Sequence, residues 1–148
     1  MDCPADVIFV LDESGSVGLP NFNLMKAFLV ALVGTLDINS GDTRVGAVTY
    51  STAVDLAEAF NLNAHSSVAL VQSAISSFTY SGGLKYTNLA LRHVRTVMLT
   101  AANGDRPNVP NVVVVLTDGG SSNMPATQVC THLPGPFLVC SSTQKRQS

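Results

Sequence analysis

Apolar residues follow two patterns along the chain: short unbroken runs, and longer stretches in which they recur every three or four residues. The runs at residues 7–11 and 111–117 are rich in β-branched side chains, which is typical of strands buried on both faces of a parallel sheet. Residues 44–50 predict another strand. Residues 53–60 follow after so short a break that they must pair antiparallel with it, because a parallel crossover needs a dozen residues or more.

Helical spacing marks three stretches between these strands. The first begins near Pro20, which suits the first turn of a helix. The second begins at Ser66 or Ser67, either of which can cap it, and the third covers residues 87–101. Their predicted buried faces are Phe22, Met25, Leu29, Leu32 and Leu36, then Val71, Ala74 and Phe78, then Leu91, Val94, Met98 and Ala101.

The alternation of strands and helices predicts an α/β fold with a doubly wound, mostly parallel open sheet of Rossmann-like type. We expect residues 7–11 at its centre, with residues 111–117 on one side and residues 44–50 on the other. Residues 53–60 are expected to form an antiparallel edge strand.

Composition narrows the class of protein. The 148 residues suffice for one domain, and 46% apolar against 12% charged residues excludes a disordered segment. A net charge of −2 without a Lys/Arg cluster argues against nucleic-acid binding. We expect no membrane span, because no apolar stretch approaches about 20 residues. The first residues lack the basic start of a signal peptide, so we expect either an intracellular protein or a segment of a longer secreted one.

Three cysteines, Cys3, Cys130 and Cys140, cannot all pair within one chain. One structural disulfide with a leftover thiol and three free thiols both remain open.

Candidate chemistry follows the first strand directly, as Asp12-Glu13-Ser14-Gly15-Ser16. Ligands in open α/β sheets bind at the carboxyl ends of the strands, and Asp118 follows the other buried strand in the same way. One carboxylate and two hydroxyls offer only oxygen, which favours Mg²⁺, Mn²⁺ or Ca²⁺ over zinc or copper. The alternative is a plain loop in which Ser14 or Ser16 caps the next helix.

The motif, the segment Thr43-Arg-Val-Gly-Ala-Val-Thr-Tyr-Ser51 and the run Val-Val-Val-Val-Leu-Thr-Asp118-Gly together resemble a von Willebrand factor type A domain. The resemblance covers residues 5–129 and is strongest to extracellular matrix members, the collagen-associated and matrilin-like domains. It implies a metal-ion-dependent adhesion site in which Asp12, Ser14 and Ser16 are ligands from the first loop. Asp118 would contact the ion as well, often through a water molecule. It also implies an extracellular location and matrix partners such as collagen, which supply an acidic side chain.

The family adds a threonine ligand from the loop before the third long helix, and here the chain departs from its Gly-x-Thr-x-Thr pattern. Without a gap Lys85 takes the ligand position, where an ammonium would oppose a divalent cation and could fill its place. With a small gap Thr87 becomes the ligand. The predicted metal set is therefore Asp12, Ser14, Ser16, Thr87 and Asp118, holding Mg²⁺ or alternatively Mn²⁺ or Ca²⁺.

The tail, residues 130–148, departs further from the pattern of the family. It holds two prolines and a glycine in quick succession, so we expect an irregular segment and an incomplete domain that lacks the family's last two strands. Either the end is truncated or altered, or this is a divergent short version of the domain. Residues 111–117 would then form an exposed apolar edge, and we expect the isolated chain to aggregate, swap strands or loosen.

The ligand set favours binding over catalysis, because a single charged ligand leaves the ion positive and open to a partner's carboxylate. The histidines, His65, His93 and His132, lie far from the strand ends in sequence, and no Gly-x-Ser-x-Gly elbow or phosphate-binding loop is present. We therefore expect no enzyme. Two alternatives stay open: a metal-dependent hydrolase or phosphotransferase on a similar sheet, and an intracellular scaffold domain.

Overall fold

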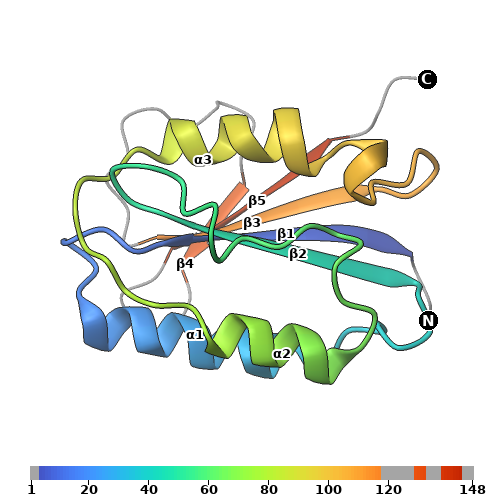
Figure 1. Ribbon diagram of the computed structural model, residues 1–148, viewed down its shortest axis with the longest axis horizontal. Coiled ribbons are helices and arrows are strands. Elements are labelled where there is room, and N and C mark those ends of the chain that lie inside the picture. Colours follow the sequence, from blue (N-terminus) through green and yellow to red (C-terminus); the bar gives the residue numbers. More distant parts are fainter. Residues whose placement is uncertain (1–3, 118–128, 133–137, 145–148) are drawn as a thin grey trace.

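The protein is an open α/β sheet covered by helices on both faces, seen here in a computed structural model that describes residues 4–117, 129–132 and 138–144 (Figure 1). The strand order is β2-β1-β3-β5-β4. The strands are β1 (Ala5–Asp12), β2 (Thr43–Tyr50), β3 (Asn111–Thr117), β4 (Val129–His132) and β5 (Leu138–Gln144). Strand β1 pairs in parallel with β2 on one side and β3 on the other, which confirms the predicted centre of the sheet.

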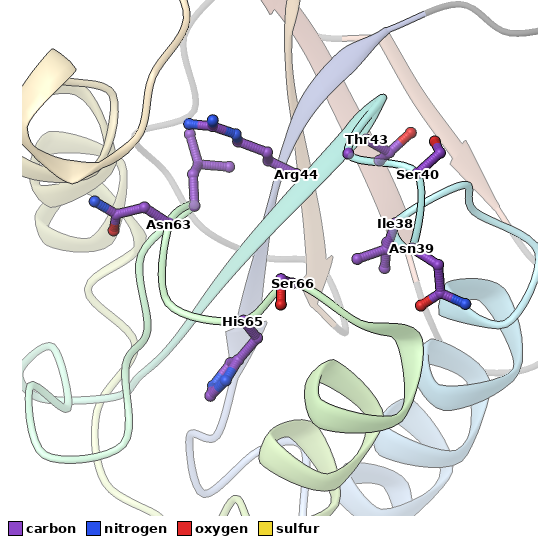
Figure 2. Close-up of a pocket in the computed structure, with 10 residues that line it drawn as sticks. Ile38, Asn39, Ser40, Thr43, Arg44, Asn63, His65 and Ser66 are labelled. Carbon is purple, nitrogen blue, oxygen red and sulfur yellow. The ribbon is translucent and has the colours of Figure 1, made fainter.

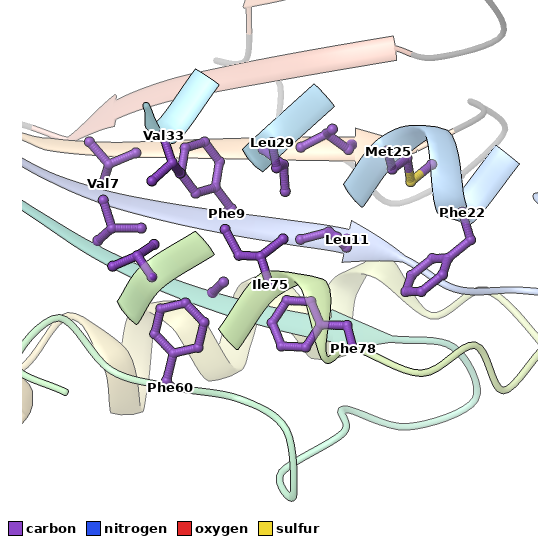
Figure 3. Packing of buried hydrophobic residues seen from close by; sticks show 14 of the residues in the cluster. Val7, Phe9, Leu11, Phe22, Met25, Leu29, Val33, Phe60, Ile75 and Phe78 are labelled. Carbon is purple, nitrogen blue, oxygen red and sulfur yellow. The ribbon is translucent and has the colours of Figure 1, made fainter. Parts of the chain in front are cut away.

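Helices α1 (Leu19–Val33) and α2 (Val68–Ser76) lie on one face of the sheet, and α3 (Thr87–His93) lies on the other (Figure 1). Alternate residues of β1 point into the two layers. Phe9 and Leu11 pack under α1 and α2 (Figure 3), whereas Ile8 and Val10 pack with residues of the α3 segment. Burial on both faces explains why the sequence of β1 shows no alternation of apolar and polar residues.

The first two helices follow the predicted pattern with small shifts. Helix α1 ends at Val33, and Val33 rather than Leu32 or Leu36 completes its fully buried face. Ser67 caps α2, accepting a hydrogen bond from the backbone N–H of Leu70 at 3.2 Å. In α2 the fully buried residues are Val71 and Ile75, and the predicted Ala74 is half-buried against the same core.

The third predicted helix is not one continuous α-helix. After α3 the chain forms a π-helical turn, η1 (Val94–Met98), and then a short 3₁₀ turn, η2 (Ala101–Asn103). The N–H of Leu99 bonds the carbonyl of Val94, five residues back. The wider turn keeps Val94 and Met98 in the core while Ala101 is exposed, contrary to its predicted burial.

The prediction of an antiparallel edge strand at residues 53–60 is wrong. The segment touches β2 antiparallel only at two isolated bridges, one pairing Ala47 with Phe60 and one pairing Tyr50 with Val54. Between them the Asp55 carboxylate accepts hydrogen bonds from the N–H groups of Ala57 and Glu58. An aspartate that bonds the backbone two and three residues on stabilises a turn, and this turn interrupts the ladder.

The prediction of an irregular tail is wrong for residues 129–132 and 138–144, which form β4 and β5. Strand β5 pairs antiparallel with β3, so β3 is not the exposed edge that the sequence suggests. The sequence signal was weak because β5 is mostly polar, with the sequence LVCSSTQ. Both strands are joined to the sheet by antiparallel pairing, β5 with β3 and β4 with β5, in contrast to the parallel crossover pairing that continues a doubly wound sheet.

Two residues singled out in the sequence, Cys3 and Asp118, lie outside the described ranges. Cys130 and Cys140 are register partners across β4 and β5.

Candidate metal centre

Asp12 is the last residue of β1 and is fully buried at the carboxyl edge of the sheet. Its Oδ1 accepts the backbone N–H of Ser14 at 2.9 Å, and its Oδ2 accepts the hydroxyl of Thr117 at 2.7 Å. Thr117 ends β3, so the carboxyl ends of the two buried strands meet at Asp12 as predicted. Asp118 follows Thr117 directly in the chain, and its place in the site stays a prediction.

Ser14 and Ser16 follow Asp12 in the same loop. Ser14 is buried and Ser16 is exposed, and their hydroxyl oxygens lie 3.2 Å apart. Neither caps α1: the N-cap of that helix is Gly18, without a side-chain hydrogen bond. The helix-cap alternative for these serines is therefore wrong, and their hydroxyls face each other beside Asp12 instead.

The loop that carries the serines is tied to the loop before α3. The hydroxyl of Tyr80 donates to the carbonyl of Ser14 at 3.1 Å, and the N–H of Gly15 donates to the carbonyl of Gly83 at 2.9 Å. Gly83 has a φ of +108°, and a Cβ there would lie 2.7 Å from the hydroxyl oxygen of Thr52. Glycine is therefore needed where the two loops meet.

The structure brings Lys85 to Asp12. The ammonium Nζ of Lys85 lies 3.4 Å from Oδ2 of Asp12, and the lysine side chain is only 15% exposed. Thr87 is buried at the start of α3, where its hydroxyl is 2.8 Å from the hydroxyl of Tyr50. The contact of Lys85 with Asp12 matches the ungapped interpretation of this loop, and a ligand role for Thr87 stays a prediction.

Glu13 is a buried carboxyl that the sequence analysis did not single out. The pKa of Glu13 is raised to about 7, chiefly by burial and to a smaller extent by the neighbouring carboxylates Asp55, Glu58 and Asp12, whereas a hydrogen bond with Ser81 lowers it. Below about pH 7 the protonated Glu13 therefore adds no negative charge next to Asp12. Only the place of Glu13 between Asp12 and Ser14 could have drawn attention to it.

The donor set suits a hard cation. The carboxylate of Asp12 and the hydroxyls of Ser14 and Ser16 are all oxygen donors. Among the described residues, no group of three or more His, Cys, Asp or Glu side chains gathers in one place, so soft-metal and multi-carboxylate sites find no support there. The positive charge of Lys85 is the feature of the site that opposes a divalent ion.

A separate cavity of about 290 Å³ lies at the opposite end of β2, near Thr43 and Arg44 (Figure 2). Its charged group is already engaged, since the Arg44 guanidinium donates to the carbonyl of Gly104 at 2.8 Å. His65, also on its lining, packs edge-on against Phe60 with ring centroids 4.9 Å apart. The carboxyl edge, with its buried carboxylate, remains the candidate site.

Comparison with known proteins shows which family has a similar sequence and fold. The sequence model of the family described as the von Willebrand factor type A domain matches residues 6–133. The chain is 38% identical over 117 residues to von Willebrand factor A domain-containing protein 2 of Mus musculus, covering 79% of this chain and 14% of that protein. It is 40% identical over 122 residues to the collagen alpha-4(VI) chain of Mus musculus, covering 81% of this chain and 5% of that protein. The chain thus spans a small part of these relatives.

Solved structures agree with the sequence matches. Proximal thread matrix protein 1 from the mussel byssus aligns with a TM-score of 0.74 at 28% identity, covering 85% of this chain and 33% of that one. A second structure of that protein has zinc in its MIDAS motif, the metal-ion-dependent adhesion site. It aligns with a TM-score of 0.73 at 26% identity, covering 84% of this chain and 33% of that one. No helix within the described ranges is long and apolar enough to cross a membrane. On the match to residues 6–133, the chain belongs to the von Willebrand factor type A domain family.

Proposed function

We propose that this domain is a metal-ion-dependent adhesion module of an extracellular matrix or cell-surface protein. The observation that carries the proposal is the buried carboxylate of Asp12 at the carboxyl edge of the sheet, beside the paired hydroxyls of Ser14 and Ser16. The relatives support the location, because they include collagen chains and matrilin-2, to which the chain is 36% identical over 119 residues.

In this proposal Asp12, Ser14 and Ser16 hold the ion, with Asp118 and Thr87 as further ligands. Mg²⁺ is the expected ion, with Mn²⁺ or Ca²⁺ as alternatives. When bound, the ion offers an open coordination position to an acidic side chain of a partner such as collagen. The hydrogen bonds from Ser14 N–H and Thr117 to Asp12 fix the direction in which the carboxylate presents its oxygens.

Binding is favoured over catalysis by the groups around the site. A hydrolase needs a base within hydrogen-bond reach of the proton that it removes. His65 packs against Phe60, and His93 lies in the last turn of α3. Glu13, the neighbour of Asp12 in the chain, has a pKa of about 7, but its side chain is buried rather than open to a substrate. The hydrolase or phosphotransferase alternative predicts turnover of a generic phosphate ester with Mg²⁺, and the adhesion proposal predicts none.

The experiment is a solid-phase binding assay on immobilised collagen in Mg²⁺ or Mn²⁺, with and without EDTA. Asp12→Ala should abolish the metal-dependent part of the binding. Asp37→Ala, which removes an exposed carboxylate beyond α1, is the matched control and should bind like the wild type. Equal binding by Asp12→Ala and the wild type in Mg²⁺ and in EDTA would contradict the proposal.

A further inference from the structure

Lys85 places a positive charge at the carboxyl edge of the sheet, where a site for a divalent cation would not be expected to have one. Its ammonium lies 3.4 Å from Oδ2 of Asp12, whose carboxylate is fully buried. A buried carboxylate is costly unless a counter-charge and hydrogen bonds compensate it. Lys85 supplies that counter-charge from within the chain.

The backbone around Lys85 is held on both sides. The N–H of Leu84 donates to the Thr52 hydroxyl at 3.0 Å, and the N–H of Tyr86 donates to the carbonyl of Ser51 at 3.1 Å. These bonds fix the point from which the side chain extends toward Asp12. The four-carbon stem of lysine remains flexible, so the ammonium can leave Asp12 without movement of the loop.

Among the three contacts described for the Asp12 carboxylate, the one with Lys85 is the longest. Ser14 N–H and the Thr117 hydroxyl bind at 2.9 and 2.7 Å, against 3.4 Å for the ammonium. The first two orient the carboxylate, whereas the third mainly balances its charge. A divalent ion on Asp12 would lie close to this ammonium and be repelled by it.

We infer that Lys85 is an intramolecular counter-cation of Asp12 that competes with the divalent ion for the same carboxylate. The domain then folds with Asp12 neutralised before any ion arrives, and the ion enters by displacing the ammonium of Lys85. The inference rests on the proposed function, because it takes Asp12 as the residue that binds the ion.

The test compares Mn²⁺ binding by calorimetry and melting temperature in EDTA for the 148-residue chain and its variants. Lys85→Met should bind Mn²⁺ at least about tenfold more tightly than the wild type, because the competing charge is gone. It should melt at a lower temperature in EDTA and gain more from added Mn²⁺. Lys85→Thr is a second variant with the same expectation, and Asp12→Asn should bind no Mn²⁺.

Two controls separate the position from the charge. Lys85→Arg keeps the positive charge and should bind Mn²⁺ like the wild type. Lys26→Met removes a lysine whose ammonium contacts the carbonyl of Phe78 at 2.8 Å, and it should also leave Mn²⁺ affinity unchanged. Variants at position 85 that unfold in EDTA and refold on addition of Mn²⁺ would support the inference as well.

The outcomes against the inference are distinct. Equal Mn²⁺ affinity in the wild type and both neutral variants would overturn it and leave the proposed function standing. A lower melting temperature that Mn²⁺ does not restore would overturn it by making Lys85 a purely structural partner. Absence of Mn²⁺ binding in every chain would overturn both the inference and the assignment of an ion to Asp12.

Discussion

The two ends of β1 each carry a fully buried aspartate, and the two are neutralised in different ways. At the amino end, Arg106 contacts both oxygens of Asp6, with Nε and Nη2 at 2.9 and 2.8 Å from Oδ1 and its backbone N–H at 2.8 Å from Oδ2. At the carboxyl end, Asp12 has an ammonium at 3.4 Å and two hydrogen-bond donors.

The difference lies in the remaining donors of each cation. The guanidinium of Arg106 also donates to the carbonyls of Ala5, Gly41 and Asp42, so its fork is held in one geometry. A planar guanidinium with several fixed donors holds the segments that it bonds in one arrangement. The ammonium of Lys85, in contrast, is a point charge on a flexible stem. The same strand thus carries a structural ion pair at one end and an exchangeable one at the other.

The largest effect is expected at the amino end. Arg106→Met removes the counter-charge of buried Asp6 and should lower the free energy of unfolding by about 3–5 kcal/mol, with or without divalent ions. Urea denaturation in EDTA and in Mg²⁺ measures it. Arg95→Met, at an exposed arginine of η1, is the control and should change stability by less than about 0.5 kcal/mol. A loss below about 1 kcal/mol for Arg106→Met would show that the two ends do not differ in this way.

The next effect concerns pH at the carboxyl end. Burial raises the pKa of Glu13 from 4.5 to about 7, so the folded chain keeps a proton that the unfolded chain releases. The contribution of Glu13 to the free energy of unfolding is therefore fully present below pH 4.5 and is lost as the pH rises through about 7. Glu13→Gln should match the wild type at pH 4 and exceed it by about 2–3 kcal/mol above neutrality.

This pH prediction is checked by urea denaturation in EDTA across the range, always as the difference between Glu13→Gln and the wild type. The comparison matters because burial lowers the pKa of His93, which makes the folded state lose stability as pH falls. That second contribution is the same in both chains and cancels. A difference that does not change with pH would contradict the buried, protonated Glu13.

A smaller effect is expected from Thr117→Val, which removes the hydroxyl that donates to Oδ2 of Asp12. A lost hydrogen bond to a buried carboxylate costs about 1.5–3 kcal/mol in general, and Lys85 remains to offset part of it here, so we expect about 1–2 kcal/mol. Thr43→Val, at the amino end of β2, is a control for a buried threonine outside the site. Equal losses in the two variants would argue against a special role of Thr117.

The smallest effect on stability is expected from Ser16→Ala. Ser16 is exposed, so its loss should change the free energy of unfolding by less than about 0.5 kcal/mol. Because its hydroxyl is a proposed ligand, Mn²⁺ affinity should fall clearly, and calorimetry measures that. Ser40→Ala, at another exposed serine, should change neither quantity.

The sequence alone determined the architecture around the site. Unbroken apolar runs identified β1 and β3, because burial on both faces leaves a local pattern in the chain. The positions of these runs before Asp12 and Asp118 located the candidate functional edge. The motif Asp12-x-Ser14-x-Ser16 and the resemblance built on it identified the family. Local turn chemistry at Asp55 was as readable in principle, but the apolar content of residues 53–60 favoured a strand.

Only the tertiary structure decided which distant residues meet. Arg106 and Asp6 are 100 residues apart. Lys85 reaches Asp12 across two loops that are bonded to each other through Gly15 and Gly83. Sequence spacing left Lys85 and Thr87 as alternatives, since a gap of a residue or two leaves no trace in a single chain. The pairing of polar β5 with β3 was hidden for a similar reason: backbone hydrogen bonds make the ladder, and they depend little on side-chain type.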